Sequence, residues 1–308
     1  MKKNSLFCCG LLCFFTLQVA AQQIQSRSIL AGFDFVFNPG MTAVGQHGRV
    51  GAAHRQDWLG FEGAPQTSTA FGEIPVVYER MSAGLLVQTD RAGAFTADEI
   101  TGTYNYKIRP GFFYRDQISV GVSGGAKRLH FDGNNLRVQT DNDPAAVTAV
   151  DSDTQAQFGG GFFYVSDRRM YTRERGAFYI GAGGMQLTTF DSGIFPEAGY
   201  RQTIHTNAIL GGMIVKNFFT LKPEIWADYA LKSPLILTAS LTAEWENILW
   251  AGGSFRTDKT VAGYIGIKIP TGDYRRFYAG FAANYNIGNV GEQRGVGYEA
   301  IFTYDFEM

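Results

Sequence analysis

Histidines and carboxylates are the residues of this chain best suited to catalysis, and their spacing argues against a catalytic centre. The chain has four histidines, and no two have the i, i+4 spacing that presents a metal-binding pair from one helix: His47, His54, His130 and His205. His130 and Asp132 form the one neighbouring pair that resembles an acid–base dyad, at a strand end where a polar loop begins. We therefore predict that the chain is not an enzyme and holds no metal ion or other cofactor.

The loop after this pair is acidic. Its aspartates offer the carboxylate oxygens that Ca²⁺ prefers: Asp141, Asp143, Asp151 and Asp153. The loop lacks both the glycine turn and the distal glutamate of a calcium-binding loop, so we interpret it as a solvated connection.

Two glycine runs, residues 159–161 and 181–184, invite comparison with phosphate-binding loops. No helix follows either run, and a phosphate loop requires one. We expect strand glycines that permit a bend or the close approach of another backbone.

The first residues have the pattern of an export signal. Lys2 and Lys3 precede an apolar run over residues 6–17, and Val19-Ala20-Ala21 offers small residues for cleavage. The apolar run is short for a membrane-spanning helix, which needs about 20 residues, so an uncut anchor is the weaker alternative. We expect a signal peptide over residues 1–21 and a mature chain that begins at Gln22.

Composition narrows the class of protein further. The formal net charge is −1, from 27 basic and 28 acidic residues, so no basic surface for nucleic acid is indicated. All three cysteines lie inside the predicted signal peptide, which leaves the mature chain without a thiol, a disulfide or a thiolate metal site. Glycine (38 residues), aromatic residues (14%) and a low charged fraction (18%) suit strands with one lipid-facing side.

Strict alternation of apolar and polar residues identifies the fold. From Phe277 the odd positions are apolar, while the even positions, beginning with Tyr278, are mostly small or polar. The same alternation runs through residues 219–229, 235–245, 261–269 and 296–306. Soluble strands average about five or six residues, whereas these runs approach the length of about 9–11 that a membrane strand needs. After the signal peptide no apolar run is long enough for a spanning helix, so a membrane-embedded chain must form a closed barrel.

Turn residues divide residues 22–308 into fourteen expected strands in one domain, an even number as in bacterial single-chain barrels. The strands are expected at residues 47–57, 66–73, 81–90, 97–108, 116–131, 154–166, 176–189, 200–216, 218–231, 235–246, 248–257, 260–270, 276–287 and 296–307. The predicted fold class is all-β: a transmembrane antiparallel β-barrel of about 14 strands in the outer membrane, after a cleaved signal peptide.

The lengths of the connections orient the barrel. With a periplasmic N-terminus, the longest connection, residues 132–153, falls outside the cell. Tight turns near residues 216–217, 246–247 and 271–273 then fall on the periplasmic side, which is the usual asymmetry. Arginines at 168, 169, 173 and 175 crowd another periplasmic turn, where solvation is the preferred interpretation and a partner the alternative.

The inward faces of these strands carry charges of both signs: Lys222, Glu224, Asp228, Glu244, Arg256, Lys268, Glu299 and Asp305. Such charges either give an open pore its selectivity or pair with one another and fill the lumen. His205 falls on the same face, as a polar lumen residue.

The connection between the first two strands is expected outside the cell and is rich in aromatic residues. Trp58, Leu59 and Phe61 stand there beside only two acidic residues, Asp57 and Glu62. Exposed groups of this kind mark binding surfaces. The alternative is that Trp58 belongs to the aromatic girdle at the membrane interface. We name Trp58, Leu59 and Phe61 as candidate partner-binding residues.

Several short motifs follow one another in the order of a known family. Asn38-Pro39-Gly40-Met41 precedes residues 54–58, which read His-Arg-Gln-Asp-Trp, and residues 63–67, which read Gly-Ala-Pro-Gln-Thr. Further matches lie at residues 103–107, 178–181, 221–224 and 249–256. In this order the chain resembles the PorP/SprF family of type IX secretion system membrane proteins. It departs from the family pattern by inserting Asp57 before the tryptophan and by its residues at 284–286 and 295–299.

The resemblance implies an outer-membrane protein that helps a large cell-surface protein with a type IX sorting domain to be exported or held at the surface. Its implied partners are the secretion machinery, that cargo and outer-membrane lipid, with no nucleic acid. It also associates the chain with gliding motility. Whether the chain is a core component or a paralogue dedicated to one cargo stays open. The alternative function is an outer-membrane channel or transporter for small or hydrophobic substrates.

Overall fold

The computed structural model describes residues 28, 34–45, 47–77, 80–111, 115–133, 149–168, 176–191, 201–231, 233–272, 275–288 and 295–307. The predicted signal peptide, Asp141, Asp143 and the arginines at 169, 173 and 175 lie outside these ranges. No helix of the described residues is long and apolar enough to cross a membrane.

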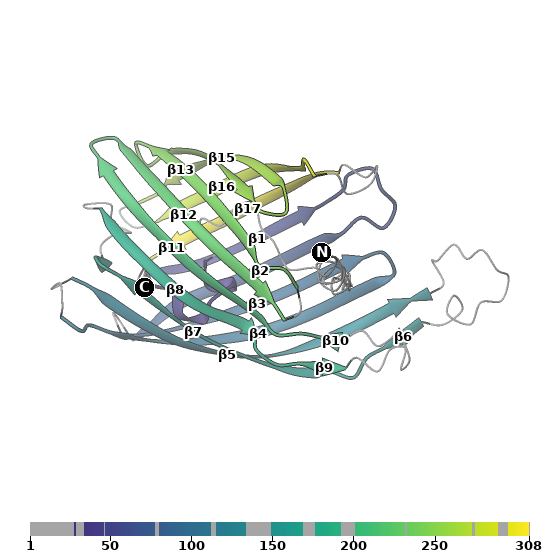
Figure 1. Ribbon diagram of the computed structural model, residues 1–308. Helices are drawn as coiled ribbons and strands as arrows, with labels where there is room; N and C mark the ends of the chain where they lie inside the picture. Colours follow the sequence, from purple (N-terminus) through teal and green to yellow (C-terminus); the bar gives the residue numbers. More distant parts are fainter. Residues whose placement is uncertain are drawn as a thin grey trace, which may run out of the picture.

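Antiparallel strands make up most of the structure, and fourteen long strands form one barrel (Figure 1). They are β1 (Gly48–Gln56), β2 (Gln66–Val77), β3 (Met81–Ala92), β4 (Phe95–Ile108), β5 (Gln117–Asp132), β7 (Gln155–Val165), β8 (Ala177–Gln186), β11 (His205–Lys216), β12 (Phe219–Ala230), β13 (Ile236–Trp245), β14 (Leu249–Arg256), β15 (Thr260–Pro270), β16 (Arg276–Asn286) and β17 (Val296–Phe306). Each corresponds to one expected strand, so the predicted fold class is confirmed.

The barrel closes between its first and last strands. Each long strand pairs with the next along the chain, and β1 pairs with β17 over the register from Gly48↔Phe306 to Gln56↔Tyr298. Closure gives every wall strand a partner on both sides, which is the condition for backbone polar groups inside a bilayer.

Two short strands add to the predicted set: β6 (Ala149–Asp151) and β9 (Phe190–Asp191). A third, β10 (Arg201–Gln202), takes the first residues of the strand expected at 200–216, so the wall strand β11 begins later than predicted. β6 extends the ladder from β5, while β9 and β10 pair with each other outside the barrel sheet. β2 also continues past its expected end. It accommodates Pro75, which has no N–H to donate, through a register shift between Pro75 and Val77.

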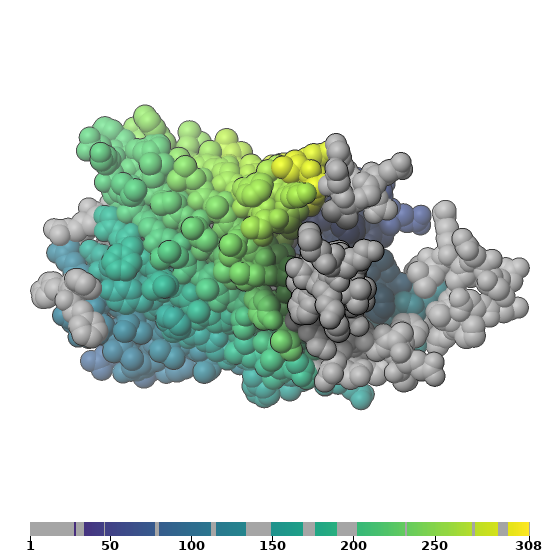
Figure 2. Space-filling model, in the orientation of Figure 1, coloured from purple at the N-terminus to yellow at the C-terminus, as the bar shows by residue number. Residues whose placement is uncertain are grey.

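The two faces of the wall differ as the alternation predicts. Outward residues stay exposed, with Ile265 at 59% and Phe281 at 51%, whereas the inward Tyr264 and Glu299 are buried. The outward side chains pack into a continuous surface over β11, β12 and β13, as the space-filling view shows (Figure 2). An apolar outer band of this kind is the lipid-facing surface of a membrane barrel.

The ends of the barrel carry different connections. Tight turns join β11 to β12 and β13 to β14, and Asn217, Glu246 and Asn247 adopt positive φ angles of 45°, 48° and 58° there. Such angles suit two-residue hairpin turns, whose twist matches that of the strands. The opposite end carries β6 and the extension of β5 (Figure 1). Following the predicted orientation, we call the end with the tight turns periplasmic and the end with β6 external.

The lumen holds an element that we did not predict. Residues 34–45, here called the plug, contain two 3₁₀ turns, η1 (Asp34–Val36) and η2 (Pro39–Met41), and lie inside the ring of strands (Figure 1). Phe35, Val36 and Met41 are buried in one core cluster with aromatic residues of the wall such as Trp226 and Trp250. The core of this barrel is therefore the packing of the plug against the lumenal side chains.

Candidate functional site

The plug folds around Asn38. The Asn38 Oδ1 accepts a hydrogen bond from the Gly40 N–H at 2.8 Å, and Pro39 occupies the first position of η2, where its lack of an N–H costs nothing. Thr42 completes the turn by donating from its hydroxyl to the Pro39 carbonyl at 2.9 Å. This local network explains how a short segment without helical periodicity adopts one compact shape.

Glycines of the wall form the surface under the plug. The Asn38 Nδ2 donates to the Phe162 carbonyl of β7 at 3.0 Å, and Oδ1 fills the space that a side chain on Gly161 would need. A Cβ on Gly183 of β8 would lie 2.9 Å from the same oxygen. On β5, Gly121 leaves equivalent room for the backbone of Pro39. The glycine runs do permit a close approach, but the plug group that approaches them is the Asn38 side chain, and the plug backbone approaches Gly121 instead.

Lumenal side chains hydrogen-bond with the main chain of the plug. Asn207 of β11 donates to the Phe37 carbonyl at 2.8 Å, and Asn105 of β4 donates to the Gly40 carbonyl at 2.6 Å. Buried backbone groups outside regular structure need such partners, because an unpaired one costs as much as a lost hydrogen bond. The wall asparagines therefore supply the hydrogen-bond donors that the plug carbonyls would receive from a neighbouring strand in a sheet.

Ala43 of the plug is held between two oppositely charged side chains. Its N–H donates to Glu73 Oε2 of β2 at 2.6 Å, and its carbonyl accepts from Lys107 Nζ of β4 at 2.5 Å. Both side chains are buried. Ala43 has a φ of 43°, a left-handed conformation that costs a non-glycine residue about 1–2 kcal/mol. The two charges stabilise a backbone shape that alanine would not adopt by itself.

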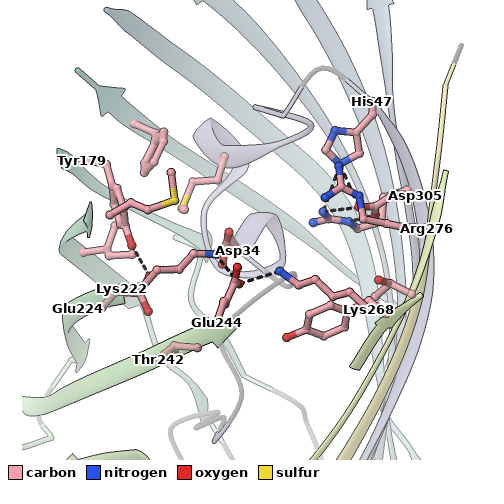
Figure 3. A pocket seen from close by; sticks show the side chains of 17 residues that line it. Asp34, His47, Tyr179, Lys222, Glu224, Thr242, Glu244, Lys268, Arg276 and Asp305 are labelled. Carbon is pink, nitrogen blue, oxygen red and sulfur yellow. Dashed lines mark hydrogen bonds and ion pairs between the residues drawn. The ribbon is translucent and has the colours of Figure 1, made fainter. Parts of the chain in front are cut away.

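The charged residues of the lumen pair with one another. Lys222 and Lys268 both contact Glu244 Oε1, at 2.9 and 2.6 Å, and the Tyr179 hydroxyl donates to Glu224 at 2.5 Å (Figure 3). These groups line a cavity of about 100 Å³ beside the plug.

A second group of charged residues links β1 and β17, the first and last strands of the barrel wall. Arg49 of β1 contacts Asp305 of β17 at 2.6 Å, and Arg276 and His47 approach the same carboxylate at 3.5 and 3.3 Å (Figure 3). Arg256 pairs with Asp258 at 2.8 Å. The inward charges were expected either to give an open pore its selectivity or to pair and fill the lumen. The ion pairs of the structure support the second interpretation.

His130 lies in a small charged cluster at the external end. The register of β5 and β6 places it opposite Asp151, with 2.5 Å between His130 Nδ1 and Asp151 Oδ1, and Arg128 contacts the other oxygen at 2.5 Å. The hydrogen bond with His130, aided by the Arg128 charge, holds the pKa of Asp151 below its ordinary range. All three side chains are solvent-exposed. The described residues contain no group of three or more His, Cys, Asp or Glu side chains arranged to hold a metal ion.

The candidate partner-binding residues share one ordered loop at the external end. Trp58, Leu59 and Phe61 are 45%, 41% and 45% exposed. The Leu59 N–H donates to the Val296 carbonyl of β17 at 2.8 Å, which ties the loop to the neighbouring strand. The structure thus brings the three residues together.

Polar residues lie between this loop and the apolar band of β1 and β2. His54 Nδ1 and Ser68 Oγ are 2.9 Å apart on the outer surface, and Gln56 pairs with Gln66 at the end of the same ladder. An aromatic girdle follows directly on the apolar band. Tyr298 of β17 lies beside these polar pairs, with its ring centroid 6.0 Å from that of His54, and Leu59 adjoins the exposed Val296.

The sequence of the chain matches one known protein family. The family model for type IX secretion system membrane protein PorP/SprF matches residues 18–304. No curated protein sequence matches the chain.

Solved structures that resemble the chain include three membrane barrels. The CymD monoaromatic hydrocarbon channel is 12% identical with a TM-score of 0.56, over 92% of this chain and 95% of that one. A TodX monoaromatic hydrocarbon channel mutant is 10% identical with a TM-score of 0.60, over 92% and 96%. A Pseudomonas aeruginosa FadL homologue is 9% identical with a TM-score of 0.52, over 87% and 91%. At these identities the likeness shows the barrel fold.

Proposed function

Because the chain belongs to the PorP/SprF family of type IX secretion system membrane proteins, we propose that it assists the export or surface attachment of a large cell-surface protein. The cargo is a protein with a type IX sorting domain, and the secretion machinery is the second partner. The chain is an outer-membrane barrel of this secretion system.

The plug is the observation that carries this proposal. Residues 34–45 and the ion pairs around Glu244 and Asp305 occupy the lumen, where a passive channel needs water. A filled barrel supports a role in binding other proteins more than a role in conducting solutes. The external loop with Trp58, Leu59 and Phe61 offers the surface for a protein partner, since exposed aromatic residues are frequent anchors at interfaces.

The alternative is a channel or transporter for small or hydrophobic substrates. It is favoured by the structural neighbours, two of which are monoaromatic hydrocarbon channels by name. The paired charges and the plug inside the lumen argue against it. We also propose that the protein catalyses no reaction, because the His130–Asp151 pair lies exposed to solvent at a strand end.

Two measurements test the proposal. Cells that lack the protein should lose one or more large proteins from their surface, with those proteins found in the periplasm or the medium. The purified protein should support no current in planar bilayers. An unchanged set of surface proteins, together with a conducting purified barrel, would overturn the secretion role in favour of transport.

A further inference from the structure

The wall of the lumen binds the plug through groups that every peptide carries. The carbonyls of Phe37, Gly40 and Ala43 accept from Asn207, Asn105 and Lys107, and the Ala43 N–H donates to Glu73. We call these four wall side chains, together with the glycine surface of Gly121, Gly161 and Gly183, the socket. Contacts to main-chain groups fix the path of a bound segment while making few demands on its side chains.

The socket is selective at two positions of the plug. Asn38 fits over Gly161 and Gly183, where a longer side chain would meet the backbone of β7 and β8. Gly40 lies against β7, and a Cβ there would be 2.8 Å from the Phe162 carbonyl carbon. The Phe162 backbone is held in ladders with both β5 and β8, so it cannot easily yield. The preferred ligand therefore carries asparagine and glycine two positions apart, as Asn38 and Gly40 are in the plug.

The barrel wall is complete without the plug. The barrel sheet is built from strands alone and closes through the β1–β17 ladder, and the plug adds no strand to it. Every wall strand keeps its two backbone partners if the plug leaves, which is what stability in a bilayer requires.

We propose that the socket is a peptide-binding site, that its present occupant is the chain's own plug, and that the plug is a separable ligand. A peptide with asparagine and glycine at these positions, supplied from outside the chain, then occupies the same site when the plug is displaced. This inference is independent of the secretion role.

The experiment displaces the plug while leaving the socket intact. The variant Gly40→Val changes the plug alone, and its side chain cannot fit against the Phe162 backbone. Asn38→Ala is a milder second variant that removes the hydrogen bond to the Phe162 carbonyl. Each full-length protein is purified, and its folding is checked by a shift in gel mobility on heating, which a closed barrel without free edges should show. Current through planar bilayers is then recorded before and after addition of a synthetic peptide of residues 34–45.

We expect both variants to keep the heat-dependent shift and to show open-channel current that the unaltered protein lacks. The peptide with the natural sequence should close these channels, whereas a peptide carrying Gly40→Val should not. On a barrel with Gly161→Ala, which obstructs the socket itself, neither peptide should close the channel.

Three results would overturn the proposal. If neither variant forms a heat-modifiable barrel, the plug is part of the barrel fold. If both variants stay closed, Asn38 and Gly40 do not hold the occupant of the lumen. If the channels open but the natural peptide leaves the current unchanged, the plug is not a separable ligand.

Discussion

The Asn38 side chain of the plug occupies the space above Gly161 of β7 that any larger residue on β7 would fill. The same side chain accepts from Gly40 at 2.8 Å and donates to the Phe162 carbonyl at 3.0 Å. One asparagine thus both folds the plug and fixes it to the wall, and its position requires that residue 161 of β7 have no side chain.

Replacing Gly161 by alanine should open the barrel to ions. The new methyl group would meet the Asn38 amide, and the plug would have to move away from the wall. Gly160 is the matched control, because a Cβ there would meet only the Gly121 carbonyl at 3.8 Å. Gly160→Ala should leave the lumen closed and stabilise the strand by about 0.5–1 kcal/mol. Equal bilayer currents from the two variants would contradict the role of the glycine surface.

Lys107→Met should lower the stability of the barrel by about 1–3 kcal/mol, because the buried Ala43 carbonyl loses its donor. Glu73→Gln should cost less, since the glutamine oxygen can still accept from the Ala43 N–H. The midpoint of urea unfolding, followed by the heat-dependent gel shift, measures both. If the two side chains act on one residue of the plug, the double variant should lose less than the sum of the single losses. Strict additivity would show that they act independently.

Changing Trp58 and Phe61 together to alanine should reduce surface retention of the cargo while the barrel stays inserted and heat-modifiable. The expected cause is the loss of exposed aromatic anchors from the external loop. Phe158→Ala, which removes a 60% exposed aromatic residue from the outer face of β7, serves as the control. Unchanged display with an intact barrel would remove the loop from the mechanism. Loss of the barrel would instead identify Trp58 as part of the girdle.

An epitope tag inserted between residues 134 and 148 should bind antibody on intact cells. This connection follows β5 at the end opposite the tight turns, and long connections of outer-membrane barrels face outward. A tag in the turn at residues 246–247 should be detected only after the outer membrane is permeabilised. The reverse pattern would invert the orientation of the whole barrel.

The barrel was predictable because each strand meets lipid on one face and the lumen on the other. That difference appears directly in the sequence: Phe281 and Phe302 alternate with Ala282 and Thr303, and the structure places each on the expected face. The end of β2 was harder to predict, since Pro75 weakens the strand signal and is accommodated by a register shift.

The plug left a much weaker signal. Its twelve-residue segment has no period of two or of 3.6, and its hydrogen bonds reach residues as distant as Asn207 and Asn105. The glycine runs indicated the close approach of another backbone, whereas the plug group that approaches them is the Asn38 side chain. Likewise, the partner of His130 in β6 follows from a strand pairing across the acidic loop, which no local pattern of residues specifies.

The seam between β1 and β17 also governs the order in which this protein can be assembled. It joins the first and last strands of the described barrel wall, and the Arg49–Asp305 ion pair links them from the lumenal side. A chain that lacks β17 cannot form the seam, so closure of the barrel requires the last strand. Contacts between such distant residues form slowly. The plug directly precedes β1, so the segment that fills the lumen is synthesised before every strand of the wall that encloses it.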